Sequence, residues 1–301
     1  MPAPRSSLAT ARGFTLTEIL VAVTVLLILV ALVAQLFNST TRVTNLSNSH
    51  LDADNTARLL FARMAADFSR IVKRVDVDYY LKGNDGYSST DSNKNDQLAF
   101  YCEVPGYSSS GGNTSNSISL VAYRLNSGST NQRPYVERMS KALPWSNANS
   151  QTPAIFLPLT ISSAWPTAIS STATDSDYEV ITPNIIRFEY DYLLRNGTLS
   201  ATPWIPQFDS NGDDTGTING LKDVTAIGVT IAVLDRKSAT IMTTDEAVNL
   251  ASQMRDFQPN ATMGQLEQNW QSTVNSSSLP APKKGGVYIY SRLFYLSTFA
   301  N

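Results

Sequence analysis

The sequence has very little of the side-chain chemistry that many enzymes use, with one cysteine and one histidine in 301 residues. Cys102 alone cannot form an internal disulfide, and together with His50 it cannot complete a structural zinc site, which takes four ligands. There is no glycine-rich phosphate loop and no Gly-x-Ser-x-Gly motif, and a Ser-His-Asp triad would have to use His50 as its base. We therefore predict that the protein is not an enzyme and needs no cofactor.

Charged side chains are also scarce, at 16% of the residues, and the formal net charge is −2. Affinity for nucleic acid depends on clustered lysine and arginine, so the composition predicts no nucleic-acid partner. Serine, threonine and asparagine crowd the expected loops, for example in residues 108–119, as on the surface of an extracytoplasmic protein.

Glycine and proline are absent between Phe14 and Lys82, which allows one long helix. Within this stretch, residues 19–34 read ILVAVTVLLILVALVA, and Thr24 is their one polar member. A helix from Ile19 to Phe37 would rise about 28 Å, close to the thickness of a bilayer's hydrocarbon core.

Three interpretations of this apolar run compete. A secretory signal peptide would place a small-residue cleavage site after the run, but Asn38 and the polar residues that follow do not form one. A buried core helix would need cover on every side. A membrane-spanning helix fits best, with Arg5 and Arg12 keeping the N-terminus in the cytoplasm.

Glu18 lies at the edge of the apolar run with no cation near it in sequence. A carboxylate entering hydrocarbon is costly and is usually functional. The alternative is that Glu18 lies in the headgroup layer and has no role.

The residues around Glu18 favour a function. Gly13-Phe14-Thr15-Leu16-Thr17-Glu18, after a short basic leader and before the apolar helix, resembles the type IV prepilin signal. The resemblance implies that a prepilin peptidase cuts between Gly13 and Phe14 and methylates the new amine of Phe14. It also implies that Glu18 pairs with the N-terminal amine of a neighbouring subunit, because a buried carboxylate is tolerated when it is paired.

Beyond the apolar run, an amphipathic stripe predicts that the helix continues onto a globular domain. We expect His50 to be a half-buried structural residue of this stripe. At position 67 the apolar pattern is interrupted by Asp67. The stripe and its flanks comprise Val43, Leu46, His50, Ala53, Ala57, Leu60, Phe61, Met64, Phe68, Ile71 and Val75.

After about residue 76 the pattern changes to strands and long polar loops. We predict strands at 97–104, 118–125, 134–139, 184–194, 224–234 and 286–296. Alternation in 187–193 predicts one buried and one solvated face. Thr243-x-x-Glu246 is a capping box that opens a helix over 245–257, Pro259 ends that helix, and a weaker helix spans 262–274. The loops 83–96 and 196–220, with others, are too polar for a core.

These elements predict an α+β fold in which the second half of the long helix packs on an antiparallel sheet. The layout resembles the larger minor pilins and pseudopilins, such as the J-type pseudopilin of type II secretion and the W-type minor pilin. The leader, 76–87, 96–107, 120–125 and 290–297 look closer to the pilin-like Verru_Chthon cassette protein C family. The implied layout is a cleaved leader (1–13), a transmembrane helix (14–38), an amphipathic helix (39–75) and an α+β domain (76–301).

The resemblance implies a single-pass inner-membrane protein with its C-terminal domain outside the cytoplasm, in the periplasm or a filament. The implied partners are the prepilin peptidase, other pilin-like subunits and the inner-membrane assembly machinery. Two other classes remain: a membrane-anchored binding domain that joins no filament, and an anchored enzyme such as a glycosidase with paired carboxylates in a cleft.

One segment resembles the start of a calcium loop, in which oxygen ligands alternate. Its candidate ligands are Asp209, Asn211 and Asp213. Asp214 occupies the expected glycine position and Gly220 the expected glutamate position, so polar turn residues explain the segment better than calcium does.

Overall fold

The structure is a computed structural model, and it describes residues 15–73, 95–106, 118–126, 134–142, 178–205, 207, 210–211, 221–258 and 261–297. The chain divides into two units, Met1–Asn48 and Ser49–Asn301.

Helix α1 runs from Leu16 to Phe68, as the absence of glycine and proline predicts. Its middle contains several threonines, which are poor helix formers. The hydroxyl groups of Thr40 and Thr41 donate to the carbonyls of Leu36 and Phe37 at 2.9 and 2.8 Å. The polar groups of these side chains are therefore satisfied within the helix itself.

The strands form two antiparallel sheets of four strands each, where the sequence predicted a single sheet. The first sheet has the order β1-β2-β3-β4 and the second β6-β5-β7-β8. All of the predicted strands are present, and β4 and β6 are additional. The bounds are β1 Gln97–Cys102, β2 Ser119–Asn126, β3 Tyr135–Ala142, β4 Tyr178–Pro183, β5 Ile185–Leu194, β6 Leu199–Ser200, β7 Val224–Leu234 and β8 Val287–Tyr295.

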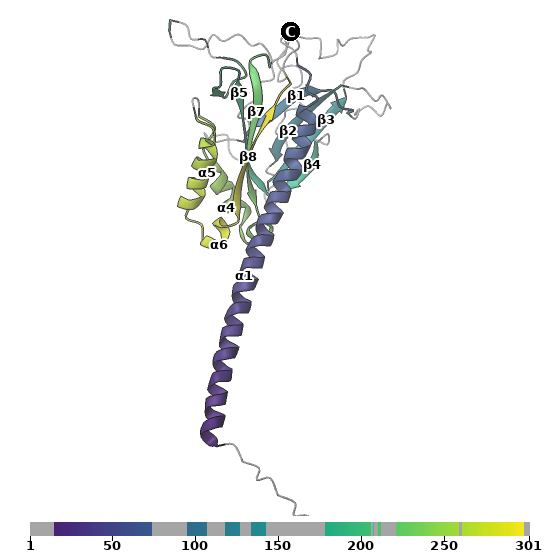
Figure 1. Ribbon diagram of the computed structural model, residues 1–301. Helices are drawn as coiled ribbons and strands as arrows, with labels where there is room; N and C mark the ends of the chain where they lie inside the picture. Colours follow the sequence, from purple (N-terminus) through teal and green to yellow (C-terminus); the bar gives the residue numbers. More distant parts are fainter. Residues whose placement is uncertain are drawn as a thin grey trace, which may run out of the picture. The chain divides into compact units, whose positions relative to one another are not determined.

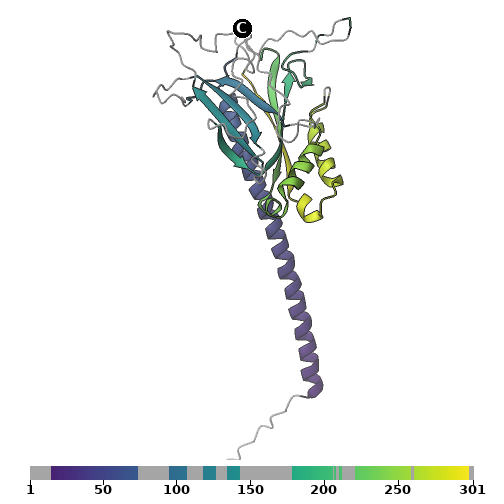
Figure 2. The same ribbon diagram turned by 180° about the vertical axis from the view of Figure 1, so that it is seen from behind.

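The main core joins the end of α1 to both sheets, and Figure 2 shows the strands of the first sheet beside this part of the helix. The predicted stripe is confirmed from Ala53 onward, because its apolar members to Phe68 are buried. The ring of Phe68 lies 5.1 Å from Phe100 of β1 and 5.1 Å from Phe294 of β8. Each fully buried side chain of this size stabilises the fold by roughly 1.5–3 kcal/mol.

His50 was predicted to be half-buried, and this prediction was wrong. The residue is exposed, and its ring stacks on Tyr288 of β8 with the ring centres 4.9 Å apart. No shielded histidine site exists here, so His50 is a surface contact between α1 and β8.

Four helices lie between β7 and β8 in sequence: α3 Arg236–Ile241, α4 Thr244–Gln253, α5 Gln265–Ser276 and α6 Ala281–Lys284. Helices α3, α4 and α5 cover the second sheet and form a smaller core with it (Figure 1), whereas α6 has no buried residue. The capping box of Thr243 and Glu246 is confirmed, and α4 ends at Gln253, earlier than predicted. Helices α3 and α6 were not predicted.

This helical insert overturns one prediction about β5. The polar residues of that strand do not face solvent, because Arg187 and Glu189 are 0% exposed and Asp191 is 7% exposed. Arg187 Nη2 lies 3.3 Å from Glu189 and also pairs with Asp256, and Glu189 accepts a 3.1 Å hydrogen bond from the backbone of Phe257. The face predicted to be wet is therefore a buried polar layer beneath the insert.

The polar end of the predicted loop 83–96 is also buried. Asn95 and Asp96 accept hydrogen bonds from the backbone N–H groups of Phe188 and Tyr190, each at 2.9 Å. Strand β6 pairs with β5 only at Tyr192 and Leu193. The side chains of Asn95 and Asp96 therefore accept from backbone N–H groups along the part of the β5 edge that β6 leaves uncovered.

Candidate functional site

The start of α1 is built around Glu18. Its Oε2 accepts hydrogen bonds from the backbone N–H and the hydroxyl of Thr15, at 2.9 and 2.8 Å. The backbone N–H of Glu18 in turn approaches the Thr15 hydroxyl at 3.4 Å. This reciprocal arrangement is a capping box, which the sequence analysis did not identify at this helix. Glu18 thus holds the first turn of the helix, whatever else it does.

The other two residues predicted for this site, Gly13 and Phe14, lie outside the described residues. The structure brings Glu18 together with Thr15 alone among the described residues, and processing after Gly13 stays a prediction.

The apolar surface of α1 begins directly after this cap. Leu16–Thr41 is long and apolar enough to cross a membrane, and its most apolar stretch is 0% buried. The side chain of Thr24 donates to the carbonyl of Val21 at 2.8 Å, so its hydroxyl hydrogen needs no water. The lack of cover argues against a buried core helix, whereas a signal sequence would satisfy the same test of length and composition.

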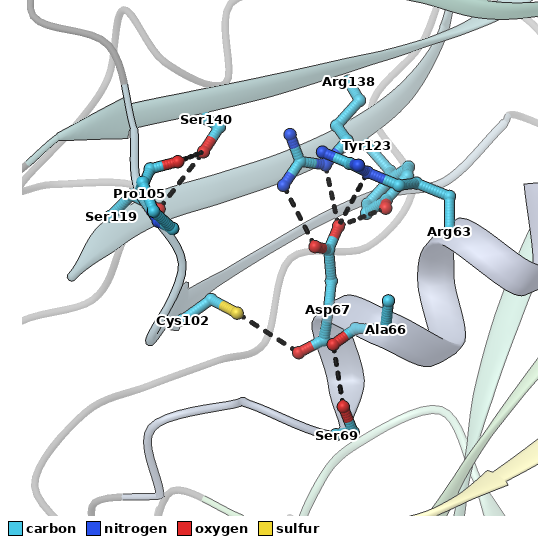
Figure 3. A network of polar contacts seen from close by, with 10 residues as sticks. All are labelled: Arg63, Ala66, Asp67, Ser69, Cys102, Pro105, Ser119, Tyr123, Arg138 and Ser140. Carbon is cyan, nitrogen blue, oxygen red and sulfur yellow. Dashed lines mark hydrogen bonds and ion pairs between the residues drawn. The ribbon is translucent and has the colours of Figure 1, made fainter. Parts of the chain in front are cut away.

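A second polar arrangement, which we call the Asp67 cluster, consists of Asp67 with Arg138, Tyr123 and Arg63 (Figure 3). Asp67 is 2% exposed and Arg138 is 5% exposed. Arg138 donates from Nε to Oδ2 at 2.7 Å and from Nη2 to Oδ1 at 3.0 Å, and the hydroxyl of Tyr123 donates to Oδ2. Arg63 lies at the rim, 4.0 Å from the same oxygen.

The Asp67 cluster is well suited to hold α1 on the first sheet and poorly suited to nucleophilic chemistry. The thiol of Cys102 donates to the backbone carbonyl of Asp67 at 3.2 Å. Burial, with the Asp67 carboxylate, raises the pKa of Cys102 to about 12. The same two causes raise the pKa of Tyr123 above its usual range. Both groups therefore stay protonated near neutral pH, and a neutral thiol is a poor nucleophile.

A cleft of about 180 Å³ lies where the second sheet meets the start of α5, and its lining includes Asp191 and Glu267. We call it the Asp191 cleft. Its two carboxylates are the kind of pair that the anchored-glycosidase interpretation requires. Its volume is below the roughly 300–1,000 Å³ typical of small-molecule pockets, which does not favour a sugar-polymer substrate.

The calcium candidates are only partly described. Asn211 lies in a turn, and Asp209 and Asp213 lie outside the described residues. Within the described ranges, no three histidine, cysteine, aspartate or glutamate residues gather as metal ligands.

In comparisons with known proteins, no family model matches the chain and no curated protein matches it. The function is therefore inferred from the residues and their geometry.

Proposed function

We propose that the protein is a minor pilin or pseudopilin, a subunit of a type IV pilus-like or type II secretion-like envelope filament. The observation that carries this proposal is a carboxylate, Glu18, in the first turn of an apolar helix with no cover. Cleavage after Gly13 would leave Phe14 as the N-terminal residue, with a positive amine four positions before Glu18.

Two opposite charges at membrane depth stabilise each other when they pair. An isolated charge costs on the order of 2.5–3.5 kcal/mol on insertion scales. Glu18 already accepts hydrogen bonds from Thr15 through one oxygen, Oε2. In the described residues its other oxygen makes no hydrogen bond, so an amine of a neighbouring subunit could approach that oxygen without opening the cap.

The proposed setting follows from this chemistry. The apolar part of α1 would anchor the protein in the inner membrane, with residues 49–301 outside the cytoplasm. The prepilin peptidase would process the chain, and other pilin-like subunits with the inner-membrane machinery would assemble it.

The mature N-terminus tests the processing step. We expect mass spectrometry of the protein from its native membrane to find N-methylated Phe14 as the first residue. An intact leader, or a cut after Phe37, would contradict the proposal. An intact leader would favour a single-pass anchor that carries a binding domain, and a cut after Phe37 would favour an ordinary signal peptide.

Three variants separate the charge of Glu18 from its capping role. Glu18→Gln removes the charge and keeps a side chain that can complete a capping box. Thr15→Ala removes the hydroxyl's part of the cap and keeps the charge, and Glu18→Ala removes the charge and the whole side-chain cap. We expect all three to be inserted and cleaved, because Gly13, Phe14 and the apolar run are unchanged.

Incorporation into filaments, measured by crosslinking, gives the decisive comparison. We expect Glu18→Gln and Glu18→Ala to be incorporated poorly and Thr15→Ala to be incorporated nearly as well as the parent. If Glu18→Gln is incorporated normally and the other two fail, the carboxylate acts only as a helix cap, and the proposed pairing is wrong.

A further inference from the structure

Strand β8 forms an outer edge of the second sheet, because β7 is its one partner among the described strands. The backbone N–H of Leu296 donates to the carbonyl of Thr225 at 2.9 Å. At the other end of the strand, the carbonyl of Gly286 accepts from the N–H of Asp235 at 2.8 Å, and the register between the two bonds is continuous. Residues of an antiparallel strand alternate between bonding to the neighbour and pointing away. The even-numbered residues of β8 therefore bond to β7, and the backbone groups of its odd-numbered residues point outward.

The outward backbone groups of β8 have no partner in the part of the chain that the structure describes. They belong to Val287, Ile289, Ser291, Leu293 and Tyr295, and no hydrogen bond of the described residues involves them. Val287 is buried, but the second half of the strand is open, since Ser291 is exposed and Tyr295 is 69% exposed. A row of unpaired backbone donors and acceptors is a template for another strand.

Arg292 gives this edge a positive charge. The residue is exposed, its guanidinium lies 5.2 Å from the ring centre of Phe294, and it forms no ion pair or hydrogen bond with a described residue. It lies on the face of β8 that meets α1, because Phe294, two positions later, packs on Phe61. A charge on an edge strand can also serve to prevent pairing, so Arg292 alone does not indicate a partner.

Tyr290, two positions before Arg292 on the same face, adds an independent observation. Its hydroxyl is buried and has no hydrogen-bond partner among the described residues, whereas such atoms nearly always have one. Burial, and after it the charge of Asp54, raises the pKa of Tyr290 to about 12, so the hydroxyl keeps its proton at neutral pH. A carboxylate beside this face of β8 would accept from Tyr290 and pair with Arg292.

We propose that the outer edge of β8 binds an extended segment of a partner protein, which adds a strand to the second sheet and places an aspartate or glutamate beside Tyr290 and Arg292. The backbone of the edge specifies an extended chain, because a strand matches its alternating outward groups. The two side chains specify the carboxylate. A second copy of this chain fits less well, because antiparallel pairing of two β8 edges would bring both copies of Arg292 onto one face. The proposal does not depend on filament assembly.

Site-specific photocrosslinking of the full chain in its native membrane tests the proposal. The photoreactive residue p-benzoylphenylalanine replaces either Ser291 or Tyr295, which lie on one face of β8, and the exposed Ser272 of α5 is the control position. We expect the two β8 positions to crosslink to a single segment of one partner protein. Mass spectrometry should find the two crosslinked residues about four positions apart, with an aspartate or glutamate between them, because facing residues keep their spacing in a sheet. The Ser272 position should not crosslink to this segment.

Variants connect the crosslink from position 295 to the edge. Ser291→Pro removes an outward N–H and leaves the hydrogen bonds to β7 in place, whereas Ser291→Ala keeps that N–H. Arg292→Glu reverses the charge, whereas Arg292→Lys keeps it. We expect Ser291→Pro and Arg292→Glu to lower the crosslinked fraction about tenfold, and the two matched variants to stay near the parent. Arg292 is exposed, so Arg292→Glu decides the matter even if Ser291→Pro does not fold.

Several results would overturn the proposal. They are the absence of crosslinks from the two β8 positions, crosslinks scattered over several segments, crosslinks to lipid or to a second copy of this chain, and equal crosslinking from the Ser272 position. A crosslinked fraction that Arg292→Glu leaves unchanged would also overturn it.

Discussion

The guanidinium of Arg138 on β3 holds the carboxylate of Asp67 on α1 through two hydrogen bonds, at 2.7 and 3.0 Å, across 71 residues of sequence. Both side chains are nearly inaccessible to water. A buried ion pair contributes little net stability compared with apolar residues, but the loss of one partner leaves the other charge buried and unpaired. The pair therefore specifies where α1 lies on the first sheet.

Replacing Asp67 with asparagine should destabilise the fold strongly. The variant leaves the Arg138 charge buried, so we expect the free energy of unfolding to fall by about 3–5 kcal/mol. Denaturant unfolding followed by near-UV circular dichroism measures this change. Asp54→Asn is the matched control on the same helix, because its partner Arg58 has a side chain that is 76% exposed. Exposed pairs contribute about 0–1 kcal/mol.

The double variant Asp67→Leu with Arg138→Met refines this prediction. It removes both charges, and we expect it to recover most of the lost stability, since apolar replacements of buried pairs are often neutral. If Asp67→Asn unfolds no more easily than Asp54→Asn, the Asp67 cluster has no structural role.

Cys102 should resist thiol reagents in the native protein. Its pKa of about 12, raised by burial and by the Asp67 carboxylate, gives roughly two- to three-thousandfold less thiolate at pH 8 than an ordinary thiol with a pKa of about 8.5. Because the chain has one cysteine, the reaction with dithiobis(nitrobenzoate) at pH 8 reports on this residue alone. We expect very slow labelling in the native state and fast labelling in guanidinium. Equal rates in the two states would show that the residue is open to solvent.

The pair of Glu246 and Lys283 should make stability depend on pH. Lys283 Nζ lies 2.6 Å from Glu246 Oε1. The hydrogen bond from Lys283, together with that from the backbone of Thr243, lowers the pKa of Glu246. Because the pKa of Glu246 is lowered in the folded state, the pair stabilises the fold at a pH above the unfolded-state pKa of about 4.3. This stabilisation is lost as the pH falls through the folded-state pKa. Glu246→Gln should therefore lower the melting temperature at pH 7, and the difference from the parent should shrink below about pH 4. A difference that stays constant from pH 7 to pH 3 would contradict the pairing.

Gly228→Ala should destabilise the protein by overpacking. The new methyl group would lie 2.7 Å from the oxygens of Asp191, and clashes of this kind cost about 1–3 kcal/mol. Combining it with Asp191→Ala removes the clashing carboxylate and should restore part of the loss, as measured by denaturant unfolding. If the double variant loses more free energy of unfolding than the two single variants lose together, the steric explanation is wrong.

The elements of this protein follow largely from local patterns in the sequence. The absence of glycine and proline before Lys82 and the apolar stripe predicted α1 and its buried face. Runs of apolar residues predicted most of the strands, and the Thr243-x-x-Glu246 pattern predicted the start of α4. These signals are readable because helix periodicity and capping involve residues at most a few positions apart.

Local sequence patterns did not predict the contacts between residues that are far apart in the chain. Asp67 interrupted the stripe, but nothing in its surroundings identified Tyr123 and Arg138, which are 56 and 71 residues away. Likewise, alternation along β5 correctly separated its two faces but could not show that α4, α5 and the segment between them cover the polar one. Side-chain periodicity determines which residues share a face, whereas only the packing of distant segments decides whether that face meets water or another element.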